Sequence, residues 1–198
     1  SFTMMPGVQS VGEFGSGINV RGGGEDQNLF LLEGAPIFNT SHLMGLLSVV
    51  NTDAVSNVTL YKGHIPTEFG ERVSSVMDIQ LYDFDIGKFT CTGGLGIYNS
   101  RLAIEGPLFV KKIIYKVSGR TRYSDFLLHK ILDYYLMHSS AKFYDLNALI
   151  TFNFKKDHIT LFGYNSYDYF DYAHQYIFNY GNTLGSVSWV HRFNENIS

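Results

Sequence analysis

The sequence predicts a small mixed α+β domain followed by antiparallel transmembrane β-barrel strands that form a partial barrel, so that the chain as a whole is mostly β. Three observations carry this prediction. Short apolar segments separated by glycine-rich and polar loops fill residues 17–80, and long stretches of alternating polarity follow after residue 84. The connections between these long stretches also differ in length in a regular order. We therefore expect two domains, 1–83 and 84–198.

The first domain is expected to contain short strands that are followed by polar loops. Ile18, Val20 and residues 29–32 are apolar, and the glycines at 22–24 allow backbone angles that a regular strand does not use. Glu33-Gly34 closes the second strand, and a polar loop at 38–42 follows it. Because the two strands are close in sequence, we expect them to pair and to present both loops side by side.

The second domain alternates between apolar and polar residues with a period of two, which is typical of strands whose two faces meet different surroundings. Leu149 breaks the alternation. The set predicted to face lipid is Tyr144, Leu146, Ile150 and Phe152. The set predicted to face the lumen is Asp145, Asn147, Thr151 and Asn153.

Strand length favours a membrane barrel over a soluble sheet. The alternating stretches run about ten residues or more, whereas strands of globular proteins average about 5 to 6. Their ends carry Tyr and Phe, as the aromatic girdles of outer-membrane barrels do. The alternative is a soluble all-β carbohydrate-binding or adhesion module. The two readings differ in one observable, because the apolar face points inward in a sandwich and toward lipid in a barrel.

The connections predict which end of each strand lies in the periplasm. Short turns are expected at 107–111 and 155–157, and long external loops at 124–142 and 170–181. The link at 98–100 is read as one compact external turn. Apolar residues at helical spacing within the first long loop predict a short helix over the barrel mouth.

Residues 17–80 resemble the plug domain of TonB-dependent outer-membrane receptors. The resemblance rests on GINVRGGGEDQNLFLLEGAPI and VTLYKGHIPTEFGERVSSVMDIQ, and residues 38–79 are similar to the Bacteroidetes-type branch of these receptors. Residues 105–125, EGPLFVKKIIYKVSGRTRYSD, resemble the second and third barrel strands of the family. Two local departures are Glu33, where the family usually has Asp, and Glu71, where a second Gly commonly precedes the Arg.

The resemblance implies TonB-dependent active import of a scarce nutrient across the bacterial outer membrane, with the plug inside the barrel lumen. The ligand class stays open between siderophore, cobalamin, glycan and peptide. The implied partners are outer-membrane lipid, a TonB-type energy-coupling protein and, beside a glycan importer, a surface lipoprotein. Because the chain offers about six barrel strands where plugged transporters have about 22, we expect a fragment with an open, curved sheet and without the TonB box.

The resemblance also implies two sets of site residues. In the family, the loops that correspond to 21–27 and 38–42 face the extracellular cavity, and for Arg21 a structural role inside the plug is an equal alternative. The predicted ligand-binding residues are Arg21, Gln27, Asn39 and His42. Charge pairs should hold the plug in a wet lumen, where exposed pairs are weak enough to yield. The predicted plug–barrel contacts are Arg72, Glu105, Arg120, Arg122 and Asp145.

Other function classes have little support. The net charge of -3 and the lack of a basic block argue against nucleic acid as a partner. The seven His and one Cys show no zinc-ligand spacing, and the acidic residues Glu25, Asp26 and Glu33 read as solvated. No nucleophile elbow or phosphate-binding loop is present. A small eight-stranded barrel enzyme would need two more strands and an acid-His-Ser set. We therefore expect no enzyme activity, no metal and no cofactor.

Overall fold

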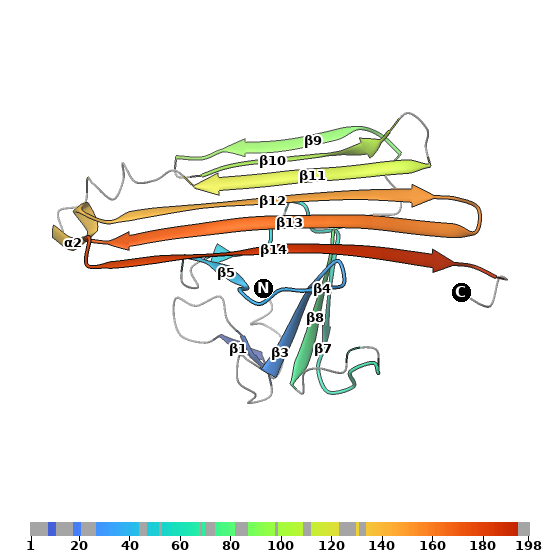
Figure 1. The fold of residues 1–198 in the computed structure, drawn as a ribbon, viewed down its shortest axis with the longest axis horizontal. Coiled ribbons are helices and arrows are strands. Elements are labelled where there is room, and N and C mark those ends of the chain that lie inside the picture. Colours follow the sequence, from blue (N-terminus) through green and yellow to red (C-terminus); the bar gives the residue numbers. More distant parts are fainter. Residues whose placement is uncertain are drawn as a thin grey trace.

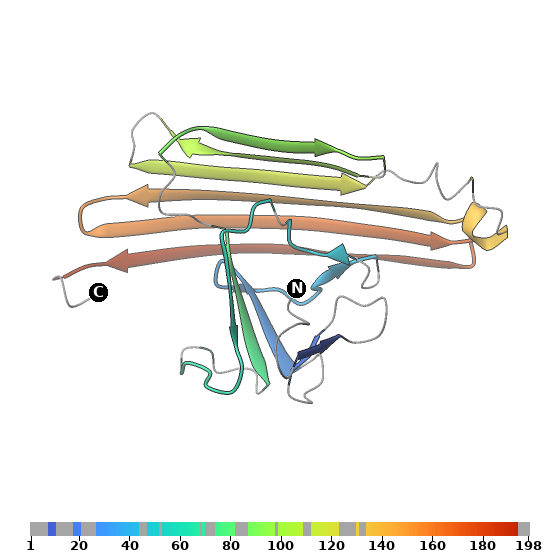
Figure 2. The ribbon, with the colours of Figure 1, turned by 180° about the vertical axis from the view of Figure 1, so that it is seen from behind.

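The computed structural model of the chain describes residues 8–10, 18–20, 27–43, 47–51, 53–67, 69, 74–81, 87–97, 99–108, 112–122, 130 and 134–193. These residues form one large antiparallel sheet and a smaller N-terminal domain, residues 8–81, which packs on one face of it (Figure 1). Seen from behind, the N-terminal domain again lies on that side only (Figure 2). Among the described residues, no helix is long and apolar enough to cross a membrane.

The large sheet is a simple meander in which each strand pairs antiparallel with its neighbour in sequence. It is open, and its edge strands are β9 and β14. A one-turn helix, α2 (Tyr134–Met137), lies in the connection before β12. The strands are β9 (Thr90–Leu95), β10 (Asn99–Pro107), β11 (Ile113–Arg122), β12 (Ser140–Asn153), β13 (Asp157–Tyr172) and β14 (Tyr176–His191).

The N-terminal domain is built around a four-stranded sheet of order β4-β3-β8-β7. Its strands are β3 (Asn28–Leu32), β4 (Ala35–Pro36), β7 (Asn57–Tyr61) and β8 (Ser75–Gln80). Two small hairpins complete it: β1 (Val8–Ser10) with β2 (Ile18–Val20), and β5 (Ser41–His42) with β6 (Leu47–Ser48). No α-helix occurs in the part of this domain that the structure describes, and the predicted boundary at residue 83 lies outside the described residues.

The predicted pairing of the strand at 18–20 with the strand at 29–32 is wrong. The first strand, β2, pairs with β1, and β3 instead runs parallel to β8 with Leu32 opposite Ile79. The reason is burial, since Leu32 of β3 shares an apolar core with Met77 and Ile79 of β8. Sequence distance alone therefore misplaced these partners.

The two faces of β12 separate as the alternation predicted. Leu146 is 51% exposed, and Tyr144 and Ile150 are exposed beside it on the face that points away from the N-terminal domain. Asp145 and Asn147 are buried on the opposite face. A sheet with its apolar residues outside and its polar residues covered matches a membrane barrel and contradicts a soluble sandwich.

Leu149, which broke the alternation, belongs to an apolar core shared by the two parts of the chain. It points toward the N-terminal domain with Ile114 and Phe162 from neighbouring strands. The N-terminal domain supplies the other side of this core through Leu32, Ile37, Val49, Val50, Ala54, Met77, Ile79 and Leu81. Fully burying one such side chain contributes about 1.5–3 kcal/mol, so this core is a major attraction between the two parts.

The long external loop predicted at 170–181 is also wrong. Strands β13 and β14 continue through this region and are joined by a tight turn in which Gln175 N donates to Tyr172 O at 2.9 Å. Ala173 and His174 both have positive φ, as in a type I′ turn. Such turns normally carry Asn or Gly, but here the Asp171 carboxylate accepts a hydrogen bond from His174 N at 2.9 Å. The sequence signal for the hairpin was therefore missing.

We predict that Leu146→Arg in the full-length protein lowers the free energy of unfolding by about 2–4 kcal/mol, because an arginine near the membrane midplane is costly. Leu146 lies mid-strand on the outward face. Ile177→Arg is the matched control, since Ile177 is exposed at the hairpin end of β14, where about 0–1 kcal/mol is expected. Denaturant titration in detergent measures both variants. Equal losses at the two positions would contradict the membrane placement of β12.

Candidate functional site

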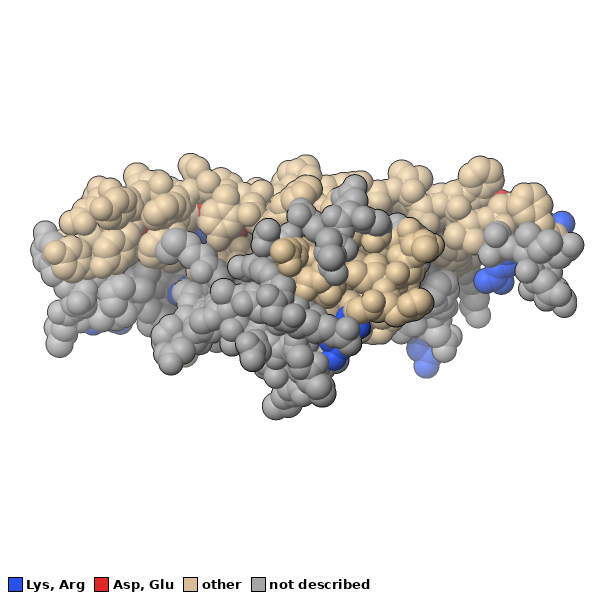
Figure 3. All heavy atoms as spheres, turned by 90° about the horizontal axis from the view of Figure 1, so that it is seen from below, with Lys and Arg blue, Asp and Glu red and all other residues tan. Residues whose placement is uncertain are grey.

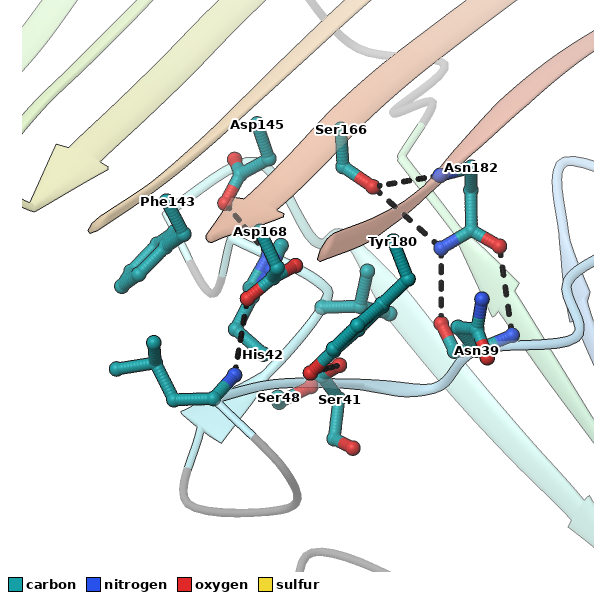
Figure 4. A network of polar contacts seen from close by, with 12 residues as sticks. Asn39, Ser41, His42, Ser48, Phe143, Asp145, Ser166, Asp168, Tyr180 and Asn182 are labelled. Atoms are coloured by element: carbon teal, nitrogen blue, oxygen red, sulfur yellow. Dashed lines mark hydrogen bonds and ion pairs between the residues drawn. The ribbon is translucent and has the colours of Figure 1, made fainter. Parts of the chain in front are cut away.

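The polar contact between the N-terminal domain and the sheet centres on His42 of β5. Its Nδ1 lies 2.6 Å from Asp168 Oδ2 of β13, and its Nε2 lies 3.3 Å from Asp145 Oδ2 of β12. None of the His42 side chain is exposed. Asp168 also accepts a hydrogen bond from Leu43 N at 2.9 Å, so it binds both the side chain and the backbone of this segment (Figure 4).

Arg120 and Phe143 complete what we call the His42 cluster, which consists of His42, Arg120, Phe143, Asp145 and Asp168. Arg120 of β11 pairs with Asp145 through Nη2 at 2.7 Å and donates from the same atom to Ser48 O of β6 at 2.7 Å. The Phe143 ring stacks on His42 with centroids 4.4 Å apart, and the Arg120 guanidinium lies 5.2 Å from the same ring. Three sheet strands thus converge on one hairpin.

A second group of contacts lies along β13 and β14. Asn182 binds the Asn39 backbone twice: its Oδ1 accepts from Asn39 N at 3.3 Å, and its Nδ2 donates to Asn39 O at 3.0 Å (Figure 4). Tyr164 OH donates to Val49 O at 3.0 Å, and Ser186 Oγ donates to Glu33 O at 2.9 Å. The hydrogen bonds of this group join side chains of the sheet to backbone atoms of the N-terminal domain.

A third group holds the end of the N-terminal domain. Lys116 of β11 donates to Leu81 O at 2.9 Å and pairs with Glu105 of β10 at 3.0 Å. Leu81 N in turn donates to the Glu33 carboxylate. Glu33 and Gly34 have positive φ and form the turn between β3 and β4. Glu33, where the family usually has Asp, therefore caps the end of β8.

The surroundings of His42 shift its protonation. Burial lowers the pKa of His42, but hydrogen bonds to Asp145 and Asp168 and the charges of both carboxylates outweigh burial, so the pKa is raised above its ordinary value of 6.5. The remaining charged group nearby is Arg120, which pairs with Asp145. The cluster can therefore hold a proton that an exposed histidine would release at neutral pH.

The structure separates the predicted ligand-binding residues. Arg21 lies outside the described residues, and Gln27 is exposed immediately before β3. Asn39 is exposed, although its backbone is bound to Asn182. His42 lies among the contacts to the sheet, so any ligand contact by His42 requires that pairing to open. Phe38, next to Asn39, is 78% exposed.

The residues predicted to hold the plug also lie in several places. Asp145 and Arg120 pair within the His42 cluster, where the Arg120 bond to Ser48 O reaches the N-terminal domain. Glu105 reaches that domain only through Lys116. Arg122 is half-buried at the end of β11. Arg72, like Glu71, lies outside the described residues.

Sequence reasoning missed Asp168, Asn182, Ser186 and Lys116. The first three lie on β13 or β14, on either side of the region read as a long loop, which hid the alternation that continues through both strands. The partner of Lys116 is a backbone carbonyl, which leaves no signal in the sequence. Within residues 157–191 the buried residues share one parity, with Asp171 the exception: Thr160, Phe162, Tyr164, Ser166, Asp168 and Asn182.

Comparison with known proteins agrees with this geometry. The profile of the family described as TonB-dependent Receptor Plug Domain matches residues 1–75, whereas no curated protein sequence matches the chain. A mutant of the ferric enterobactin receptor PfeA from Pseudomonas aeruginosa has a TM-score of 0.56 at 16% identity, over 85% of this chain and 30% of the receptor. The siderophore receptor PirA from the same organism has a TM-score of 0.54 at 14% identity, over 94% and 37%. The chain thus spans about a third of these receptors and shares their fold.

We predict that docking of the N-terminal domain weakens as the pH rises. A raised histidine pKa contributes stability that is complete below pH 6.5 and is lost as the pH rises through the higher, folded-state pKa. Amide protection factors in β5, corrected for intrinsic exchange, should therefore fall between mildly acidic and alkaline pH. His42→Gln should abolish this fall, whereas Asn182→Ala should lower protection equally at every pH. A pH-dependent fall that persists in His42→Gln would exclude His42 as the group responsible.

We predict strong coupling between Arg120 and Asp145, whose side chains are 12% and 0% exposed. Removing either partner, by Arg120→Met or Asp145→Leu, should cost about 3–5 kcal/mol because it leaves a buried charge without its closest ion-pair partner. The double variant should cost clearly less than the sum of the single losses. The control is the more exposed pair of Arg101 with Asp53, where Arg101→Met should cost about 0–1 kcal/mol. Additive losses at Arg120 and Asp145 would contradict the coupling.

Proposed function

Because residues 1–75 match the plug-domain family of TonB-dependent receptors and the chain shares the fold of two such receptors, we propose that it is the plug and first barrel strands of an outer-membrane receptor that imports a ferric siderophore. The N-terminal domain is then the plug, and the large sheet is part of the barrel wall. The two solved receptors described above are a ferric enterobactin receptor and a siderophore receptor, which favours this class over cobalamin, glycan or peptide.

The observation that carries the proposal is the one-sided burial of the sheet. Its inward face holds Asp145, Asn147 and Asp168 against the plug, while its outward face exposes Leu146. A wall of this kind separates lipid from a polar lumen that the plug fills. Import then requires the plug to move, and binding and transport need no covalent chemistry on the ligand.

The contacts of the plug suggest how it is released. The hydrogen bonds to Asn39, Val49 and Glu33 each contribute about 0.5–1.5 kcal/mol and can break one after another under a pulling force. The buried pairing of His42 with Asp168 costs more to break. We propose that a TonB-type protein supplies the force from the periplasmic side, and that the His42 cluster is the last polar contact to open.

We propose that the loops at 21–27 and 38–42 bind the siderophore. The two hydrogen bonds from Asn182 use the backbone of Asn39, which leaves the exposed Asn39 carboxamide for a ligand. Phe38 beside it offers an exposed aromatic surface. Arg21 adds a cation for an anionic ligand. The His42 cluster fixes the end of this loop to the barrel, which limits the entropy lost on binding.

We predict that replacing Arg21 and Asn39 together by alanine weakens siderophore binding roughly tenfold or more, since hydrogen bonds to charged groups contribute about 1.5–3 kcal/mol. Folding should be spared. Binding of ferric siderophores to the purified full-length receptor, and growth of iron-limited cells that depend on it, measure the effect.

The control is His64→Ala, which alters an exposed plug residue outside both loops and should change neither readout. Unchanged affinity of the double variant at normal outer-membrane abundance would move recognition to the barrel loops. Lost abundance would support the structural role of Arg21. Growth on a glycan, peptide or cobalamin, with none on any ferric siderophore, would overturn the proposed ligand class.

A further inference from the structure

The outward face of the barrel sheet carries an apolar groove that crosses β9, β10, β11 and β12. Its volume is about 940 Å³. The strand register fixes the face, because exposed Leu146 lies opposite Gly119, and Gly119 lies opposite Leu102, which is exposed as well. The outward-facing residues that line the groove include Gly93, Leu102, Val117, Gly119, Tyr144 and Leu146.

Two glycines lower the floor of this groove. Gly93 and Gly119 lie on either side of Leu102 in one row across the sheet. A methyl group added at Gly119 would meet its nearest atoms, Asp145 O and Leu146 Cδ1, at 3.5 Å, which is ordinary contact. A side chain therefore fits at Gly119 without a clash, and it would occupy the groove. The groove is thus a consequence of the missing side chains and not of strand curvature alone.

The charged residues beside the groove turn their side chains to the other face of the sheet. Arg101 pairs with Asp53 of the N-terminal domain at 2.8 Å, and Arg120 pairs with Asp145 at 2.7 Å. In Figure 3, which shows the molecule from below, the margin of the sheet opposite the plug is filled almost entirely by uncharged side chains. The groove therefore presents apolar surface to its occupant, and an apolar chain gains free energy by entering it.

Tyrosine residues mark the depth of the groove in the membrane. The rings of Tyr144 and Tyr167 lie 6.1 Å apart on the outward face at one end of the groove. Toward the other end of the sheet, Phe152 and exposed Trp189 share a row on the same face. The two rows are about 27 Å apart along β12, at about 3.4 Å per residue. Barrels place aromatic girdles on both sides of an apolar band about 25 Å tall. The groove thus begins at one girdle and extends into the hydrocarbon.

We propose that this groove holds an acyl chain of a lipid in the extracellular leaflet of the outer membrane. The short turns at 108–112 and 154–156 assign the far end of the sheet to the periplasm, so the Tyr144 end is extracellular. A chain in the groove contacts side chains on both sides of it, whereas a chain on the flat wall contacts one surface only. A lipid is therefore retained here in preference to the rest of the wall. The proposal rests on the proposed membrane placement of the sheet and not on the imported ligand.

Native mass spectrometry of the detergent-purified full-length receptor tests this proposal with an equimolar mixture of lipid A and phosphatidylglycerol. Lipid A is the probe for the extracellular leaflet, and we expect its preferential retention. Gly119→Leu should weaken retention about tenfold, because the new side chain displaces about two methylene groups of the acyl chain. Gly119→Ala should cause a smaller loss. The matched control is Gly163→Leu, which adds the same side chain on the outward face outside the groove, where an added methyl meets nothing within 4 Å.

Equal retention of the two lipids, or equal losses in Gly119→Leu and Gly163→Leu, would overturn the proposal. Preferential retention of phosphatidylglycerol would overturn the extracellular assignment. A receptor dimer that Gly119→Leu dissociates would assign the groove to a second copy of the protein. Heat resistance of the folded receptor in electrophoresis verifies that the variants fold. Siderophore binding is measured in the same samples, so a wrong import ligand and a wrong lipid site give different results.

Discussion

Two carboxylates on neighbouring barrel strands, Asp145 and Asp168, lie buried on the inward face of the sheet and require positive partners. Arg120 pairs with Asp145 from within the sheet, and His42 of the plug lies between Asp145 and Asp168. An unpaired charge at this depth costs several kcal/mol, so the sheet is incomplete without the plug hairpin that carries His42. This requirement fixes the position of β5 along β12 and β13, and it thereby also places the loop that contains Asn39.

The interface combines two kinds of contact that respond differently to force. The apolar core around Leu149 and Phe162 gives most of the free energy of docking, but it has no preferred direction and permits sliding. The polar contacts give less energy and fix the register, because a hydrogen bond is lost after a small displacement. A plug that must stay closed and yet be movable needs both kinds. Because its surroundings raise the pKa of His42, we expect the polar part to depend on pH.

The outward face obeys a different constraint, since lipid offers no hydrogen bonds to side chains or strands. Its middle is apolar around Leu146, and polar and aromatic groups gather where the strands end. Plug contacts and apolar wall are thus consequences of one sheet that separates a polar lumen from hydrocarbon.

The sequence by itself determined the division into plug and barrel strands and the faces of β12, because alternation is a local property that one buried face imposes on every second residue. It did not determine the partner of β3, the hairpin at 173–175 or the role of His42. The partner of β3 depends on the apolar core that Leu32 shares with Ile79 of β8, and the hairpin depends on Asp171 holding a turn that lacks Asn and Gly. His42 meets carboxylates more than 100 positions away, and such contacts exist only once the plug is docked.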